Sequence, residues 1–180
     1  MSSLNPDRIV ILDRDGVINE DSPDYIKTPD EWIPIPGSME AIALLHQKGF
    51  KIYVATNQAG IARGKFSVSS LQAIHEKMQH EVETAGGRIS GIQYCPHHPD
   101  EKCQCRKPEP GMLYRITEES GAELSGAPYV GDSLKDIRAA ETAGCKPVLV
   151  LTGNGLETHQ VRPNLAHVYK DLLAFAKDCM

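Results

Sequence analysis

The stretch VILDRDGVIN (residues 10–19) joins a segment suited to burial to a cluster of polar residues. Branched apolar residues at 9–12 are typical of a strand that a sheet buries on both faces. Asp13 and Asp15 follow directly, and Gly16 comes after them. Because open α/β sheets bind ligands beyond the carboxyl ends of their strands, this stretch predicts a strand that delivers two carboxylates to a binding site.

Apolar segments of strand length alternate with segments of helical periodicity along the rest of the chain. Strands are predicted at residues 9–12, 51–56, 89–94, 128–130, 147–151 and 167–168. Helices are predicted from an N-cap at Ser38 to just before Gly49, across residues 71–82, 111–120 and 134–143, and near the C-terminus. This alternation favours an α/β fold, a Rossmann-like three-layer sandwich with helices on both faces of a central parallel sheet.

The length of the chain is typical of one domain, and we expect residues 1–180 to form it. Between Asp15 and Thr56 there is room for an irregular flap, a helix and a strand. Between Gln58 and Lys107 there is room for a helix, a strand and a cysteine-rich loop. Neither interval could hold a separate cap domain, so loops alone are expected to enclose the ligand.

The composition is that of an ordinary soluble globular protein, with 24% charged and 41% hydrophobic residues. A formal net charge of −5 argues against a nucleic-acid partner, because nucleic-acid-binding surfaces are broadly cationic. The start, MSSLNPDR, lacks the features of a signal peptide, and the apolar runs are too short to span a membrane. We therefore expect a cytoplasmic protein that does not bind membranes, and a monomer.

Three of the five cysteines fall in one short segment, YCPHHPDEKCQCRKP (94–108). Its candidate metal ligands are Cys95, His97, Cys103 and Cys105. Three thiolates and one imidazole form a tetrahedral Zn²⁺ site with no position left for water, which is typical of a structural zinc loop, here residues 95–105. Two alternatives stay open: His98 could replace His97, and the cysteines could be a chance cluster of thiols.

Polar residues also follow two other predicted strands, Thr56 and Asn57 after one and Asp132 after another. Carboxylates that meet at one edge of a sheet repel one another unless a cation lies among them, and a small set of hard oxygen ligands suits Mg²⁺. An EF-hand calcium loop fits poorly, because alignment on Gly16 puts Ile11 at the first ligand position. The remaining alternative is that these aspartates have a purely structural role, as turn or helix-cap residues.

Four motifs, taken in order, resemble those of the haloacid dehalogenase superfamily of phosphatases. They are Asp13-Arg14-Asp15-Gly16-Val17, Thr56-Asn57-Gln58, Arg106-Lys107-Pro108, and Gly131-Asp132-Ser133 through Asp136. Their order and spacing match over nearly the whole chain. One such motif alone is weak evidence, whereas the four in order are specific.

The resemblance implies a role for each polar residue. Asp13 would be the nucleophile that forms an aspartyl-phosphate, and Asp15 would protonate the leaving oxygen and then activate water. Thr56 and Lys107 would hold the transferring phosphoryl oxygens. Catalytic Mg²⁺ would be bound by Asp13, the backbone carbonyl of Asp15 and the side chain of Asp132.

Asp136 has two interpretations. Ser133 and Asp136 match a capping box, in which Asp136 accepts from free amides at the start of a helix. Alternatively, Asp136 could bind Mg²⁺ directly as a ligand. We favour the capping role, with Asp136 supporting the Mg²⁺ site without touching the ion.

A zinc loop between the second and third motifs is similar to one narrow branch of the superfamily. That branch includes phosphatases of heptose bisphosphates, and it implies removal of the 7-phosphate of a heptose 1,7-bisphosphate, with the 1-phosphate kept for later nucleotide activation. The candidate substrate-binding residues are Asp21, Asp24, Asn57, Gln58, Arg63, Arg106 and Ser133. Arg63 and Arg106 suit the retained phosphate, because planar guanidinium groups match phosphate oxygens. Ser133 stands where some members of the branch carry a lysine that contacts the substrate.

Three alternatives share the same motifs. Histidinol phosphate, the substrate of another enzyme of this branch, carries a cationic amine that Glu20, Asp21 and Asp24 could recognise. A nucleic-acid 3′-phosphatase is disfavoured by the acidic net charge. A zinc-stabilised binding module without catalysis is disfavoured by the complete catalytic set.

Overall fold

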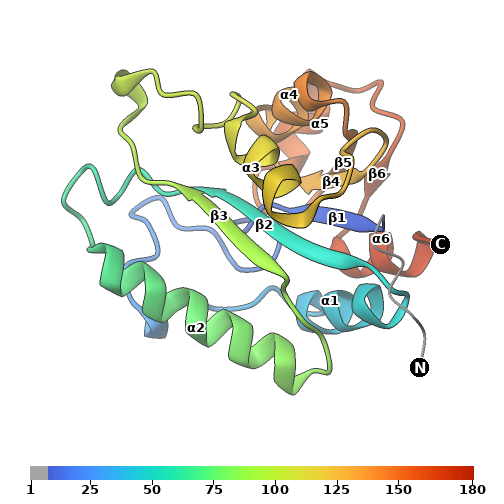
Figure 1. Ribbon diagram of the computed structural model, residues 1–180, viewed down its shortest axis with the longest axis horizontal. Coiled ribbons are helices and arrows are strands. Elements are labelled where there is room, and N and C mark those ends of the chain that lie inside the picture. Colours follow the sequence, from blue (N-terminus) through green and yellow to red (C-terminus); the bar gives the residue numbers. More distant parts are fainter. Residues whose placement is uncertain (1–7) are drawn as a thin grey trace.

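The computed structural model describes residues 8–180, and Figure 1 shows its arrangement. Within these residues, parallel strands form one six-stranded sheet in the order β3-β2-β1-β4-β5-β6. The strands are β1 (Ile9–Leu12), β2 (Lys51–Asn57), β3 (Gly91–Cys95), β4 (Pro128–Gly131), β5 (Lys146–Val150) and β6 (Val168–Tyr169). Residues 1–7, on which the expectation about a signal peptide partly rests, lie outside the described residues.

Helices cover both faces of this sheet (Figure 1). They are α1 (Ser38–Gln47), α2 (Val68–Thr84), α3 (Gly111–Ser120), α4 (Leu134–Ala143), α5 (Gly155–Val161) and α6 (Leu172–Asp178), with short 3-10 helices η1 (Pro29–Glu31) and η2 (Pro99–Glu101) in the connections. One apolar core packs α1, α2 and α6 against the sheet, and a second packs α3 and α4 against the other face. The predicted three-layer α/β fold is therefore confirmed.

Strand β1 contributes alternate side chains to the two cores, so all four of its residues are buried and apolar. Val10 and Leu12 lie in the core of α1, α2 and α6, whereas Ile9 and Ile11 lie in the core of α3 and α4. The chain adds β2 and β3 on one side of β1 and β4 to β6 on the other. This reversal of strand order creates a switch point beyond the end of β1, and Asp13 follows directly there.

The start of α1 differs from the prediction. Gly37, with a φ of 86°, is the N-cap, and Ser38 is the first helical residue. The Ser38 hydroxyl donates to the carbonyl oxygen of Ile18 at 2.6 Å. The prediction of Ser38 as N-cap is wrong because its hydroxyl, which would otherwise cap the helix, contacts Ile18 in the segment that follows β1.

The segment between β5 and β6 also differs, because the sequence predicts a loop where the structure has α5. This helix buries only Gly155 and Thr158, while Leu156 and Val161 are each 63% exposed. A helix with so little buried surface has no amphipathic period to detect. It matters here because the residue before it, Asn154, reaches the functional site.

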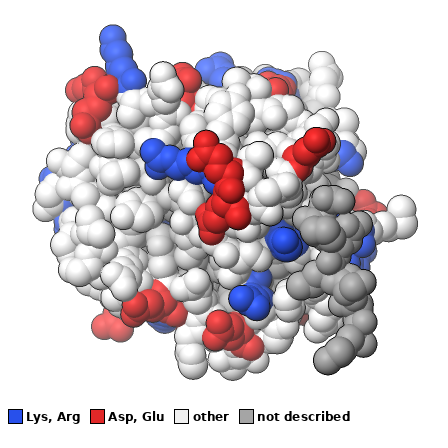
Figure 2. All heavy atoms as spheres, viewed as in Figure 1, with Lys and Arg blue, Asp and Glu red and all other residues white. Residues whose placement is uncertain are grey.

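The surface carries charges of both signs. On the face shown in Figure 2, acidic and basic side chains lie interspersed. Across residues 8–180, no helix is both long enough and apolar enough to cross a membrane.

Candidate active site

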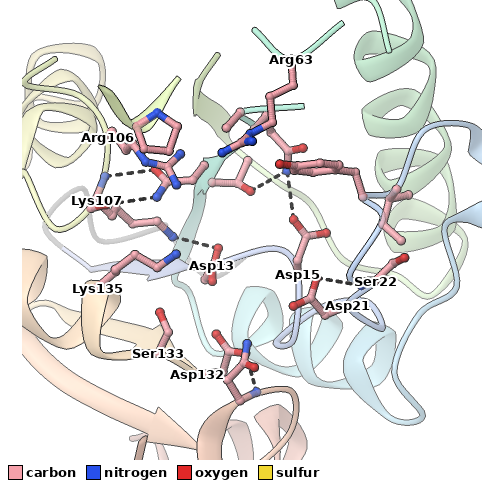
Figure 3. A pocket seen from close by; sticks show the side chains of 18 of the residues that line it. Asp13, Asp15, Asp21, Ser22, Arg63, Arg106, Lys107, Asp132, Ser133 and Lys135 are labelled. Carbon is pink, nitrogen blue, oxygen red and sulfur yellow. Dashed lines mark hydrogen bonds and ion pairs between the residues drawn. The ribbon is translucent and has the colours of Figure 1, made fainter. Parts of the chain in front are cut away.

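The polar residues at the ends of β1, β2 and β4 meet in one open pocket of about 440 Å³. The predicted residues that line it are Asp13, Asp15, Asp21, Thr56, Asn57, Gln58, Arg63, Arg106, Lys107, Asp132 and Ser133. Figure 3 shows Lys107 and Lys135 on one side of Asp13, with Asp15 and Asp21 on the other. Asp24 does not line the pocket, and its exposed carboxylate pairs with Lys27 at 3.1 Å.

Three buried aspartates lie close enough to share one cation. Asp13, Asp132 and Asp136 each present a carboxylate oxygen, and these oxygens lie within 4.8 Å of one another. Burial, together with the charge of Asp136, raises the pKa of Asp13 well above its usual range, although Lys107 opposes this. Carboxylates are hard oxygen donors, so Asp13 and Asp132 fit a small divalent cation such as Mg²⁺, with Asp136 beside them.

Asp132 is held by the loop before α5. The backbone N–H of Asn154 donates to its Oδ2 at 2.8 Å, and the Asn154 side-chain amide donates to the same oxygen at 3.2 Å. Burial, followed by the charge of Asp136, raises the pKa of Asp132 to about 7. Gly16, at a φ of 82°, allows this close packing, because a Cβ there would lie 2.1 Å from Asp132 Oδ2.

Asp136 has protein partners on both oxygens. Oδ2 accepts from the backbone N–H of Asp132 and from the N–H and hydroxyl of Ser133, as in a helix cap. Oδ1 accepts from Lys107 at 2.7 Å and from Tyr129 at 2.9 Å. Burial would raise the pKa of Asp136, but Lys107 and these hydrogen bonds outweigh it and lower the pKa. Asp136 thus orients Lys107 while its own oxygens are occupied.

The ammonium of Lys107 is surrounded by acceptors. It contacts Asp13 at 2.9 Å and also donates to the carbonyl oxygen of Ala55 at 2.9 Å. The Asn57 side-chain amide accepts from the backbone N–H of Lys107 at 3.0 Å and donates to its backbone carbonyl oxygen at 3.2 Å. Asn57, predicted to bind substrate, therefore positions Lys107 in this structure.

Asp15 accepts hydrogen bonds on both oxygens. Oδ1 accepts from Arg14 at 2.7 Å and 3.0 Å and from Asn19 at 2.9 Å. Oδ2 accepts from the Gln58 amide, which also donates to the Thr56 hydroxyl, both at 2.9 Å. Burial would raise the pKa of Asp15, but the charge of Arg14 and these hydrogen bonds outweigh it and lower the pKa.

The predicted zinc ligands form a second cluster beside this pocket. Cys95, His97, Cys103 and Cys105 each offer a donor atom within 4.8 Å of the others. Their closest contacts are 3.2 Å, from Cys105 Sγ to Cys95 Sγ and from Cys105 Sγ to His97 Nδ1. Donors about 2.0–2.3 Å from a tetrahedral Zn²⁺ would be roughly 3.3–3.8 Å apart, so the set fits that ion. His98 instead accepts from the backbone N–H of Asp100 in η2.

The pocket also includes residues that the sequence analysis did not single out. They are Ser22, Tyr25, Lys135, Asn154 and Glu157, among others. Lys135 had a detectable signal in the sequence, because it lies within the fourth motif, between Ser133 and Asp136, on the first turn of α4. Asn154 had none, because only the unpredicted helix α5 brings it to Asp132.

Comparison with known proteins identifies the family. A family model described as HAD-hydrolase-like matches residues 104–175. The D-glycero-beta-D-manno-heptose-1,7-bisphosphate 7-phosphatase of Pseudomonas aeruginosa is 53% identical over 169 residues, which cover 93% of this chain and 95% of the relative. The chain belongs to this phosphatase family. The same-named relative of Bordetella bronchiseptica is 48% identical, with 96% of this chain and 98% of the relative covered.

A solved structure agrees with this membership in the heptose-bisphosphate phosphatase family. The crystal structure of D,D-heptose 1,7-bisphosphate phosphatase from B. bronchiseptica, complexed with magnesium and phosphate, matches with a TM-score of 0.91. It is 48% identical, with 95% of this chain and 97% of that chain covered. The resemblance to the haloacid dehalogenase superfamily, and to its heptose branch, is confirmed.

Proposed function

We propose that this protein is a Mg²⁺-dependent phosphoric monoester hydrolase that removes the 7-phosphate of D-glycero-β-D-manno-heptose 1,7-bisphosphate. The observation that carries the proposal is the 48–53% identity to phosphatases of that name over nearly their whole length. The convergence of Asp13, Asp132 and Lys107 in one pocket supports it from the chemistry. The product would keep its 1-phosphate, as a precursor for nucleotide activation toward the lipopolysaccharide core.

In the first step the Asp13 carboxylate attacks phosphorus, the bond to the sugar oxygen breaks, and Asp15 gives that oxygen a proton. Mg²⁺, held by Asp13, the backbone carbonyl of Asp15 and Asp132, would neutralise charge on the phosphoryl group when bound. Lys107 and Thr56 hold the phosphoryl oxygens. At about 4 Å and an effective dielectric near 20, each pair of like charges costs roughly 4 kcal/mol, so the cations are essential to this attack.

In the second step water attacks the aspartyl-phosphate, and Asp15 takes the proton of that water. Phosphate leaves and the Asp13 carboxylate is restored. Asp15 must hold a proton before the first step, although its neighbours lower its pKa in the free protein. The negative charge of an incoming phosphate ester opposes this effect, because a nearby anion raises the pKa of a carboxyl group.

The 1-phosphate would be recognised by the cationic side of the pocket. Arg63, Arg106 and Lys135 all line the pocket, and Nη1 of Arg106 is buried without a hydrogen-bond partner within residues 8–180. Arg106 follows Cys105 directly, so Zn²⁺ bound to the cysteine loop would fix the backbone from which this side chain reaches the pocket. The zinc is then structural in chemistry but serves substrate binding.

The same arrangement disfavours histidinol phosphate. Of the three acidic residues offered for its amine, only Asp21 lines the pocket, whereas Glu20 and Asp24 do not. Glu157 is a further acidic residue of the lining. A pocket that presents two arginines and a lysine suits a second phosphate better than a cation. We further propose that residues 1–180 act as one catalytic domain, as a cytoplasmic monomer without nucleic-acid or membrane partners.

Phosphate release tests the proposal. The purified protein is assayed with heptose 1,7-bisphosphate and with histidinol phosphate, each with Mg²⁺ and with a chelator. We expect Mg²⁺-dependent release and a clear preference for the heptose substrate. A preference for histidinol phosphate would overturn the substrate assignment, and release that is independent of Mg²⁺ would overturn the mechanism.

A further inference from the structure

His75 is a buried histidine outside the residues assigned to the proposed mechanism. It lies on α2, is 7% exposed, and faces the inside of the molecule with its Nε2. Burial, together with the nearby Arg14, lowers the pKa of His75 to about 3, so its ring is neutral in the working pH range. A neutral ring has one nitrogen with a free lone pair that can accept a hydrogen bond.

That lone pair has a specific partner. Nη1 of Arg14 lies 3.2 Å from His75 Nε2, and a guanidinium can only donate. Arg14 is fully buried, at 0% exposure, where a charged group needs partners for its donors. Its Nε and Nη2 both donate to Oδ1 of Asp15. His75 therefore supplies the acceptor for Nη1, so each of the three guanidinium nitrogens of Arg14 has a hydrogen-bond partner.

We infer that His75 is a positioning residue: it orients Arg14, Arg14 fixes Oδ1 of Asp15, and Oδ2 of Asp15 is thereby presented to the ester oxygen. The inference rests on the proposed function. Oδ1 already accepts from Arg14 twice and from Asn19, whereas Oδ2 accepts from Gln58. Oδ2 is thus the oxygen from which the proton passes to the sugar oxygen as the bond from phosphorus to that oxygen breaks.

The leaving group separates this role from mere packing. A sugar oxygen is a poor leaving group and needs a proton from Asp15, whereas an aryl oxygen leaves without one. A misplaced Asp15 should therefore slow departure of the sugar far more than departure of the aryl group. A loss of folded protein would lower the rate for both esters by the same factor, so the ratio of the two kcat/KM values cancels it.

The test compares His75→Leu, which removes the acceptor, with His75→Gln, whose amide oxygen can still accept from Arg14. Both are assayed as purified full-length protein with heptose 1,7-bisphosphate and with 4-nitrophenyl phosphate. We expect His75→Leu to lower kcat/KM at least about tenfold for the heptose ester and less than about threefold for the aryl ester. His75→Gln should stay within about threefold of the wild type on both. His80→Leu, an exposed histidine on the same helix, is the matched control.

Each other outcome overturns the inference. Equal losses on both esters would make His75 a packing residue only, and so would a His75→Leu protein with unchanged rates. Failure of a folded His75→Gln protein to recover activity on the heptose ester would do the same. If His75→Leu does not fold, the more adaptable His75→Met replaces it. Failure of the proposed function is distinct, because the wild type itself would then release no phosphate from the heptose substrate.

Discussion

The ammonium of Lys107 lies 2.9 Å from Oδ1 of Asp13. The same nitrogen lies 2.7 Å from Asp136, so one cation serves two buried carboxylates. Even so, burial and the charge of Asp136 keep the pKa of Asp13 well above its usual range. The folded protein therefore disfavours the ionised Asp13 that nucleophilic attack requires, and a bound divalent cation would relieve this.

Asp13→Asn should lower the activity of the protein and raise its stability. An amide cannot form the aspartyl-phosphate, so we expect phosphate release to fall at least about a thousandfold. Because folding disfavours ionised Asp13, the neutral amide should raise the unfolding temperature of the metal-free protein at neutral pH. Phosphate release and thermal unfolding measure the two effects, with the exposed Asp24→Asn as control. Unchanged release in Asp13→Asn would rule out this nucleophile.

Lys107→Met should lower both stability and activity. The change leaves Asp13 and Asp136 close together without their shared cation, and breaking a buried ion pair in this way typically costs about 3–5 kcal/mol. Denaturant unfolding of the metal-free protein measures the loss. Lys177→Met, at an exposed lysine on α6, should change the free energy of unfolding by less than about 0.5 kcal/mol. Similar small changes in both variants would contradict the shared-cation arrangement.

Cys103→Ser should remove the structural zinc and, with it, activity. We expect about one equivalent of zinc in the wild type and a clear loss in the variant, because a serine hydroxyl is a poor ligand beside thiolates. The unfolding temperature and phosphate release should fall together, since Arg106 and Lys107 directly follow the loop. Cys179→Ser, outside the cluster, is the control. A wild-type protein purified without chelator and free of zinc would refute the site.

Arg106→Gln should weaken binding of the 1-phosphate specifically. The buried Nη1 of Arg106 lacks a partner within the described chain, and a phosphate oxygen would supply one. We expect KM for the heptose bisphosphate to rise about tenfold, the loss of roughly one charge-assisted hydrogen bond, with little change for a heptose 7-monophosphate. Arg138→Gln, at an exposed residue of α4, is the control. Equal effects on both substrates would remove Arg106 from the 1-phosphate site.

His75 should make the protein less stable in mild acid. Its pKa is about 3 in the folded protein and about 6.5 in an unfolded chain, so below pH 6.5 the unfolded chain binds a proton that the folded protein does not. Stability therefore falls as the pH drops from 6.5 toward 3. Between pH 7.5 and 5, the wild type should lose about 2 kcal/mol more than His75→Gln. Parallel curves from urea unfolding of the two proteins would show that His75 is not held neutral.

Local sequence patterns were enough to predict the architecture. The unbroken apolar residues of β1 reflect burial on both faces, and the elements from β2 to β5 lie close to their predicted positions. Helix α5 was missed because it buries too few residues to produce an amphipathic pattern in the sequence. Ser38 was misassigned because a contact with Ile18 replaced the local cap.

For the candidate site too, some residues could be predicted from the sequence, and others are brought there only by the fold. The order of four short motifs, and the spacing of cysteines and histidine, are properties of the chain itself, and they determined the superfamily, the reaction and the metals to expect. Only the packing of α2 against the sheet brings His75 to Arg14, and only α5 brings Asn154 to Asp132. Such contacts join residues far apart in the chain, so they depend on the relative placement of whole elements and leave no local pattern to detect.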